Sequence, residues 1–270
     1  MDKPFYKMEL TPLTSEPQSV EPPASTMSLA GRLMNVFAAP GEVFGEIKTV
    51  PPRVANWLTP AILLIVLSWV SGWLIFSQPA IQQQMSDISN KAIDKQVEKG
   101  KLTSAQADQA RAATEKFGSM GYKIAAVVAP VFMAFITPFW GGLILWLVGS
   151  FALKAPFPYM KAVEIAGLAN MILILDVIVR TLLVLITGNL FATLSLTLAI
   201  KDFDPQNTLH SVLAMVNVMT FWLLTIRSIG LARFSGASVA KAAAWIFGIW
   251  IVLTGIMIGF GAAMKAAFGG

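Results

Sequence analysis

The sequence predicts an all-α membrane protein, a polytopic transmembrane helical bundle with about five spans. Hydrophobic residues make up 56% of the 270 residues, the mean hydropathy is +0.67, and charged residues contribute only 13%. Soluble domains carry about 25% charged residues. Several apolar stretches also reach the roughly 20 residues that a helix needs to cross a hydrocarbon core of about 30 Å. Composition and segment length therefore agree on a chain that crosses a membrane repeatedly.

Composition also argues against several function classes. The chain has no cysteine and one histidine, His210, so cysteine chemistry and histidine clusters are excluded. Asp202, Asp204 and His210 lack the spacing of a metal site, and no Ser/His, paired-Asp or HExxH arrangement is visible. We therefore expect no enzyme activity, cofactor or metal. The net charge of +5 suits the anionic face of a membrane, and we expect a lipid bilayer, not nucleic acid, as the partner.

Two segments precede the first span. Residues 1–26 are rich in proline, serine and threonine and predict a disordered tail. Met27 is an alternative start of the chain. Residues 27–52 place apolar side chains at helical spacing and predict an amphipathic helix in the membrane interface, broken at Pro40–Gly41 and ended by Pro51–Pro52.

This opening carries a resemblance to a known family. Phe37, Pro40, Phe44 and Ile47, followed by Pro51 and an apolar span, resemble the start of the bacterial Yip1-domain family of integral membrane proteins. The resemblance covers about residues 28–265 and implies five transmembrane helices and a cytoplasmic N-terminus. It also implies a long polar segment after the first helix in some members. The Tyr-Gly-Pro-type motif of the eukaryotic branch is absent, so a partnership with Rab GTPases does not follow.

The expected membrane domain covers residues 53–265. A polar insert, residues 79–117, should form a helical hairpin after the first span, because Gly100 suits a helix end and Thr103 with Gln106 matches a capping box. Residues 190–200 are too short to span and predict a re-entrant or interfacial segment. The five expected spans are about 57–77, 122–153 (kinked at Pro130 and Pro138), 161–186, 209–231 and 242–264.

Asp176 and Arg180 are the most unusual residues, because they lie in the middle of the third span. Four residues apart, they share one helix face and can form an ion pair. One interpretation is a polar site for an ion, a proton or a lipid headgroup. The other is a structural ion pair that fixes the rotation of the helix. Glu164 and Arg227, also inside apolar stretches, are further candidates for an intramembrane polar site, although the helix dipole and snorkelling explain each of them structurally.

Short loops predict the orientation. With a cytoplasmic N-terminus, the tail and the short loops on that side hold nine Lys and Arg residues against two on the far side, although seven more in the insert region would equalise the count. We therefore expect a cytoplasmic-membrane protein with its C-terminus outside. Gly255 and Gly259, four residues apart, suggest a face for close helix packing or a homo-oligomer.

These observations favour a non-enzymatic scaffold or adaptor that organises the membrane. The alternative is a small transporter, channel or lipid-handling protein that uses the Asp176–Arg180 pair.

Overall fold

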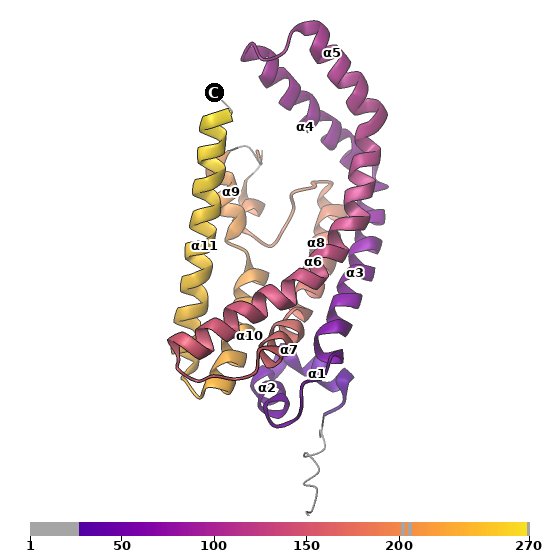
Figure 1. Cartoon of the computed structure of the whole chain (residues 1–270). Coiled ribbons are helices and arrows are strands. Elements are labelled where there is room, and N and C mark those ends of the chain that lie inside the picture. Colours follow the sequence, from indigo (N-terminus) through magenta and orange to yellow (C-terminus); the bar gives the residue numbers. More distant parts are fainter. Residues whose placement is uncertain (1–26, 201–202, 205–206, 269–270) are drawn as a thin grey trace, which may run out of the picture.

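The computed structural model describes residues 27–200, 203–204 and 207–268, and the predicted tail of residues 1–26 lies outside them. Figure 1 shows an elongated helical bundle in which the helices run mostly along the long axis. In the described residues the regular structure is helical, apart from one isolated β-bridge. The predicted all-α bundle is therefore confirmed.

A two-helix hairpin forms the base of the bundle. Its helices are α1 (Leu29–Ala38) and α2 (Pro40–Thr49). The helical conformation is interrupted between them at Ala39. Ser28 caps α1 by accepting a hydrogen bond from the Gly31 amide, and Pro40 suits the first turn of α2 because it needs no amide donor there. The apolar side of this hairpin packs on the protein itself. Its place in the membrane interface stays a prediction.

The next helices lead away from the base and return to it. α3 (Ala55–Phe76) runs to the far end, where α4 (Pro79–Glu98) and α5 (Ser104–Ala113) form a hairpin (Figure 1). Gly100 has φ +68°, and Thr103 and Gln106 form a capping box at the start of α5. A short π-helix, Thr114–Gly118, leads into α6 (Ser119–Leu147), which returns to the base and ends in a second π-helix, Val148–Ala152. Both prolines of this span lie inside a continuous helix.

The third span is the centre of the bundle. It consists of α7 (Tyr159–Ala169) and α8 (Met171–Thr187), which meet at Asn170. Residues 161–169 of α7 are all buried, and α7 packs against α6, α3 and α10. A methyl group added at Gly167 would lie 2.3 Å from Trp57 Cβ, so glycine is required for this close approach of α7 to α3.

The fourth expected span, 209–231, is divided into two helices in the structure. They are α9 (Thr208–Met215) and α10 (Val218–Ser235), and the break falls at Val216–Asn217. The segment after α8 lies against this break, because Ser195 forms a β-bridge with Asn217. A short 3₁₀-helix, Leu196–Ala199, follows that bridge and lies within the segment predicted as re-entrant or interfacial.

The last helix, α11 (Val239–Phe268), runs from the base to the far end and packs mainly on α10 (Figure 1). In the described residues, four helical segments are long and apolar enough to cross a membrane, and the α9–α10 stretch is not among them. By length and composition, the described residues therefore hold four candidate spans, and the α9–α10 stretch consists of two shorter helices. The four segments are Ala55–Phe76, Met120–Ala152, Tyr159–Thr187 and Val239–Met264.

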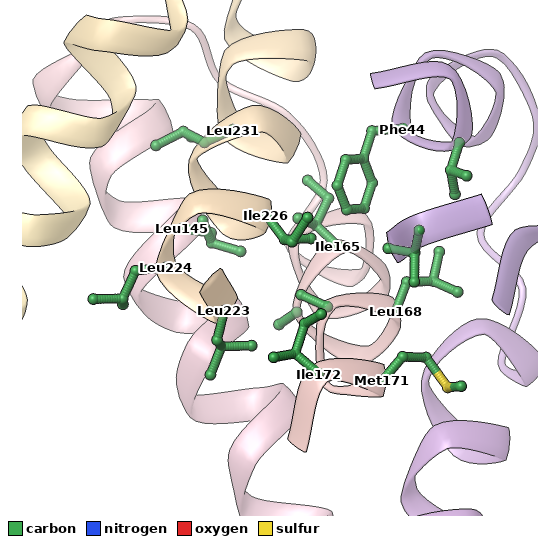
Figure 2. Close-up of a cluster of buried hydrophobic side chains, with 14 of the residues drawn as sticks. Phe44, Leu145, Ile165, Leu168, Met171, Ile172, Leu223, Leu224, Ile226 and Leu231 are labelled. Atoms are coloured by element: carbon green, nitrogen blue, oxygen red, sulfur yellow. The ribbon is translucent and has the colours of Figure 1, made fainter. Parts of the chain in front are cut away.

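The main core lies where the base hairpin meets α7 and α10. Figure 2 shows Phe44 of α2 against Ile165 of α7, with Leu231 and Ile226 of α10 on the other side. Phe44 and Ile165 are fully buried. Since lipid is as apolar as these side chains, close packing must supply much of the stability of a bundle of this kind. The hairpin is thus an integral part of the bundle.

Candidate functional site

The four predicted site residues occupy three separate places. Glu164 lies in a buried polar network at the base, Arg227 lies between α6, α7 and α10, and Asp176 and Arg180 lie along α8. The structure therefore does not join them into one site, and each place has its own geometry.

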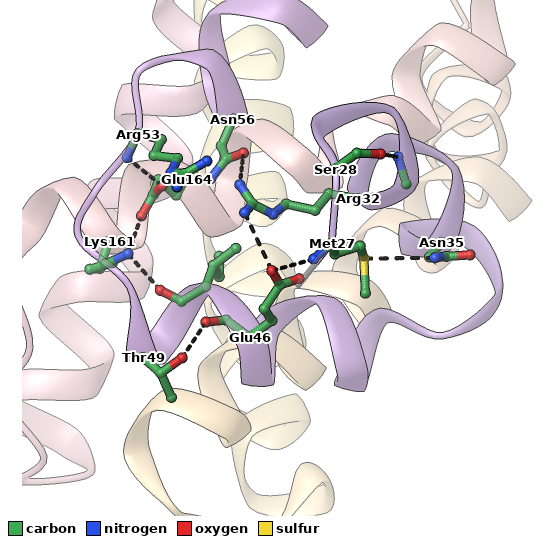
Figure 3. A network of polar contacts seen from close by, with 12 residues as sticks. Met27, Ser28, Arg32, Asn35, Glu46, Thr49, Arg53, Asn56, Lys161 and Glu164 are labelled. Carbon is green, nitrogen blue, oxygen red and sulfur yellow. Dashed lines mark hydrogen bonds and ion pairs between the residues drawn. The ribbon is translucent and has the colours of Figure 1, made fainter. Parts of the chain in front are cut away.

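Glu164 is the centre of the base network, shown in Figure 3. Its side chain is fully buried, and its Oε1 accepts hydrogen bonds from the Arg53 amide at 2.7 Å and from Asn56 Nδ2 at 2.7 Å. Its Oε2 lies 2.7 Å from Lys161 Nζ, one helical turn earlier. Lys161 Nζ also donates to the Ile47 carbonyl at 2.5 Å. The carboxylate therefore joins α7 to the loop before α3, and Lys161 joins α7 to α2.

Asn56 extends the network to the first helix. While its Nδ2 donates to Glu164, its Oδ1 accepts from Arg32 Nη1 at 3.0 Å. Arg32 is buried too, and its Nη2 lies 3.4 Å from Glu46 Oε1. Glu46 also accepts a hydrogen bond from the Met27 amide at 2.9 Å. Asn56 thus joins the Arg32–Glu46 pair to the Lys161–Glu164 pair, an arrangement that fixes the base hairpin on the bundle.

The local sequence explains how these groups meet. Lys161 and Glu164 are three residues apart on α7, so they lie on one face of the helix. Pro51–Pro52 end the hairpin, and the following turn directs the Arg53 amide at Glu164. Asn56 lies in the first turn of α3. Two regions that are 108 to 111 residues apart in sequence therefore contribute to one buried cluster.

Asp176 and Arg180 do not form the predicted ion pair. In the described residues no hydrogen bond or ion pair shorter than 4.0 Å joins these side chains, although they lie one turn apart on α8. Asp176 is partly buried, whereas Arg180 is exposed on the helix surface. A hydrogen bond between the hydroxyl groups of Ser71 and Thr181, at 2.5 Å, instead joins this part of α8 to α3. Whether Asp176 and Arg180 are functional stays a hypothesis.

Arg227 lies inside the bundle. Its Nη2 donates to Asn170 Oδ1 at 3.0 Å, and Asn170 Nδ2 donates to Thr137 of α6 at 3.1 Å. A methyl group at Gly141 would lie 2.9 Å from Arg227 Nη2, so this glycine makes room for the guanidinium. Arg227 Nε is buried without a hydrogen-bond partner among the described residues. The guanidinium borders a cavity of about 150 Å³ between α6, α10 and α11.

Several residues of these clusters did not stand out in the sequence. Arg32 and Lys161 look like solvent-facing charges of a polar helix face and a loop, and Asn56 and Asn170 are single amides beside or within apolar stretches. One usable signal was the spacing of Lys161 and Glu164. The other was the position of each asparagine in a stretch that otherwise favours lipid, where an unsatisfied amide is costly.

Within the described residues, no group of three or more His, Asp or Glu side chains could hold a metal ion. Asp202 of the rejected metal interpretation lies outside these residues, and His210 Nδ1 accepts a hydrogen bond from the Asp204 amide at 3.0 Å.

The fold and the polar clusters define a class of protein: a multi-pass helical membrane protein with buried polar contacts between its helices. The Yip1 domain model matches residues 34–261, which is most of the chain, and the protein belongs to that family. This finding confirms the resemblance to the Yip1-domain family, and the bacterial branch stays a prediction. Comparisons with curated proteins and with solved structures gave no match.

Proposed function

We propose that this protein is a non-enzymatic scaffold or adaptor of the cytoplasmic membrane. The observation that supports the proposal is the use of its buried charges. Arg32 and Lys161 join the base hairpin to α3 and α7, and Glu46 and Glu164 are their carboxylate partners, so these four charges support a rigid platform. A scaffold needs such a platform, because its partners bind a surface of fixed shape.

The outward side of the hairpin is the proposed contact surface. Met34 is 67% exposed, and Asn35 and Glu42 of the same hairpin are also exposed. The predicted orientation places this surface at the cytoplasmic side, where it would meet a partner protein or the lipid headgroups. The exposed glycines Gly255 and Gly259 of α11 are a second proposed contact, with another copy of the chain, since a methyl group there would touch nothing within 4 Å.

Deleting residues 27–50 is a poor test of this proposal, because it would remove Phe44 and Ile47 from the core. A charge on the outward surface is a better one. We expect Met34→Asp to reduce the recovery of crosslinked partners, or the remodelling of vesicles, while the protein keeps its folded yield and thermal stability. Ala112→Asp places the same charge on the exposed insert at the opposite end and serves as the control. If both variants act like the wild type, the hairpin surface is not the scaffold contact.

A transporter or lipid-handling role is the second candidate, and one observation favours it. Asp176 and Arg180 do not form an ion pair with each other, and they lie in a helix that can cross a membrane. Placing a single charged side chain in the middle of a membrane costs a free energy on the order of 3 kcal/mol. A hydrated path would lower that cost. Under this hypothesis Asp176→Asn abolishes solute movement in proteoliposomes and leaves the fold intact. A scaffold moves no solute before or after the change.

A further inference from the structure

Arg227 is a partly buried cation, and no carboxylate among the described residues balances its charge. In the part of the chain that the structure describes, no carboxylate lies within 4.0 Å of its guanidinium, and its one hydrogen bond goes to the neutral side chain of Asn170. Taking an isolated charge out of water is expensive unless a counter-ion accompanies it. The buried Nε without a partner shows the same shortage of acceptors. The described part of the protein therefore does not supply the anion that the Arg227 guanidinium needs.

The guanidinium borders a space that could hold the missing anion. The cavity of about 150 Å³ has ten lining residues, and Arg227 is the only charged one. A cavity of this size can accept a group as large as benzene. Gly141 leaves room for the guanidinium, and Asn170, itself bonded to Thr137, holds it by a hydrogen bond. These contacts position a cation at the wall of an apolar pocket.

The surroundings of the cavity indicate the route by which a ligand would reach it. Two of its walls, α6 and α11, are segments that can cross a membrane. Trp140 in the α6 wall is 54% exposed, and Ile251, next to the α11 wall, is 61% exposed. Arg227 is eight residues from Ser235 at the base end of α10, a distance of about 12 Å along the helix. A water-soluble anion would have to cross hydrocarbon to arrive here, whereas an amphiphile already resides there.

We propose that this cavity binds the acidic headgroup of a membrane amphiphile, an oxyanion carried on a hydrocarbon chain, with Arg227 as its counter-ion. Carboxylate and phosphate oxygens both accept two parallel hydrogen bonds from a guanidinium. The hydrocarbon chain leaves between α6 and α11 and packs on their exposed apolar side chains. Fatty acids and anionic phospholipids share this chemistry.

Native mass spectrometry of the full chain in detergent micelles tests the proposal. The probes are oleate and dioleoyl phosphatidylglycerol. The controls are dioleoyl phosphatidylcholine, a zwitterionic lipid, and acetate and inorganic phosphate, which are anions without a hydrocarbon chain. We expect one tightly held oleate or phosphatidylglycerol per chain. The two probes decide whether the headgroup is a carboxylate or a phosphodiester, and either result supports the proposal.

Variants then place the binding at Arg227. Arg227→Gln should weaken the bound probe about tenfold or more, since charge-assisted hydrogen bonds are lost. Arg53→Gln removes an exposed cation at the base and should leave the affinity unchanged. Leu253→Trp fills the cavity without touching the charge and should also weaken binding, so the test survives if Arg227→Gln fails to fold.

Three results would overturn the proposal. The first is equal binding by phosphatidylcholine, which would make the cavity a neutral-lipid contact. The second is equal binding by acetate or inorganic phosphate, which would make it a small-anion site. The third is undiminished binding of oleate and phosphatidylglycerol to the Leu253→Trp variant, which would place those probes elsewhere on the protein.

Discussion

The Glu164 carboxylate offers the sharpest test of the base network. In Glu164→Gln, the amide oxygen can still accept from the Arg53 amide and from Asn56. The new amide nitrogen, however, faces Lys161 Nζ, where the structure has an ion pair of 2.7 Å. A donor then opposes a buried cation whose remaining acceptor is the Ile47 carbonyl. Breaking one partner of a buried pair costs about 3–5 kcal/mol, so we expect a loss of unfolding free energy of that size.

Equilibrium unfolding in mixed micelles, with sodium dodecyl sulfate as the denaturant, measures this loss. Glu42→Gln on the exposed side of α2 is the matched control and should change stability little. The double variant Glu164→Gln/Lys161→Met removes both charges, and its cost should fall short of the summed single costs by roughly 0.5–3 kcal/mol. A single-variant loss no larger than that of Glu42→Gln, or strictly additive costs, would refute the view that these charges depend on each other.

Three further predictions use other contacts. Gly167→Ala should destabilise the protein by about 1–3 kcal/mol because the methyl group overlaps Trp57, whereas Gly255→Ala on the open face of α11 should not; the same unfolding assay compares them, and equal effects would contradict the packing. Asn217→Ala should cost about 1 kcal/mol, since the Asn217 side chain accepts from two amides at the start of α10; an unchanged unfolding midpoint would exclude that cap. Asp176→Asn should not destabilise the fold, because no ion pair is lost; a large drop in stability would indicate a partner for Asp176.

The sequence was sufficient for the outline of the bundle because the outline follows from hydropathy and length. The sequence signals for helix ends were equally informative: the Thr103–Gln106 capping box and the left-handed conformation of Gly100 both appear in the structure. These features depend on residues that are near neighbours in the chain. The break at Asn217 has the same local character, because asparagine favours a helix N-terminus, and it could have been predicted within the apolar stretch.

The polar clusters could not be predicted because their partners are distant in sequence. Glu164 meets Asn56 across 108 residues, and Arg227 meets Asn170 across 57. Periodicity places a charge on a helix face but does not say which other helix covers that face. Arg32 is an example, since the amphipathic pattern assigns it to the polar side of its helix, yet the bundle buries it against Asn56 and Glu46.

Arg32, which is buried, and Arg227, which is partly buried, show how differently the fold treats the same side chain. Arg32 has the Glu46 carboxylate at 3.4 Å and the Asn56 amide at 3.0 Å, and it closes a network between helices. Arg227 has an amide at 3.0 Å and no carboxylate among the described residues, and it borders a cavity. A guanidinium that only held α10 against α7 would gain from a carboxylate of the kind that Arg32 has. The incomplete set of acceptors at Arg227 is therefore better explained by an anion that comes from outside the chain.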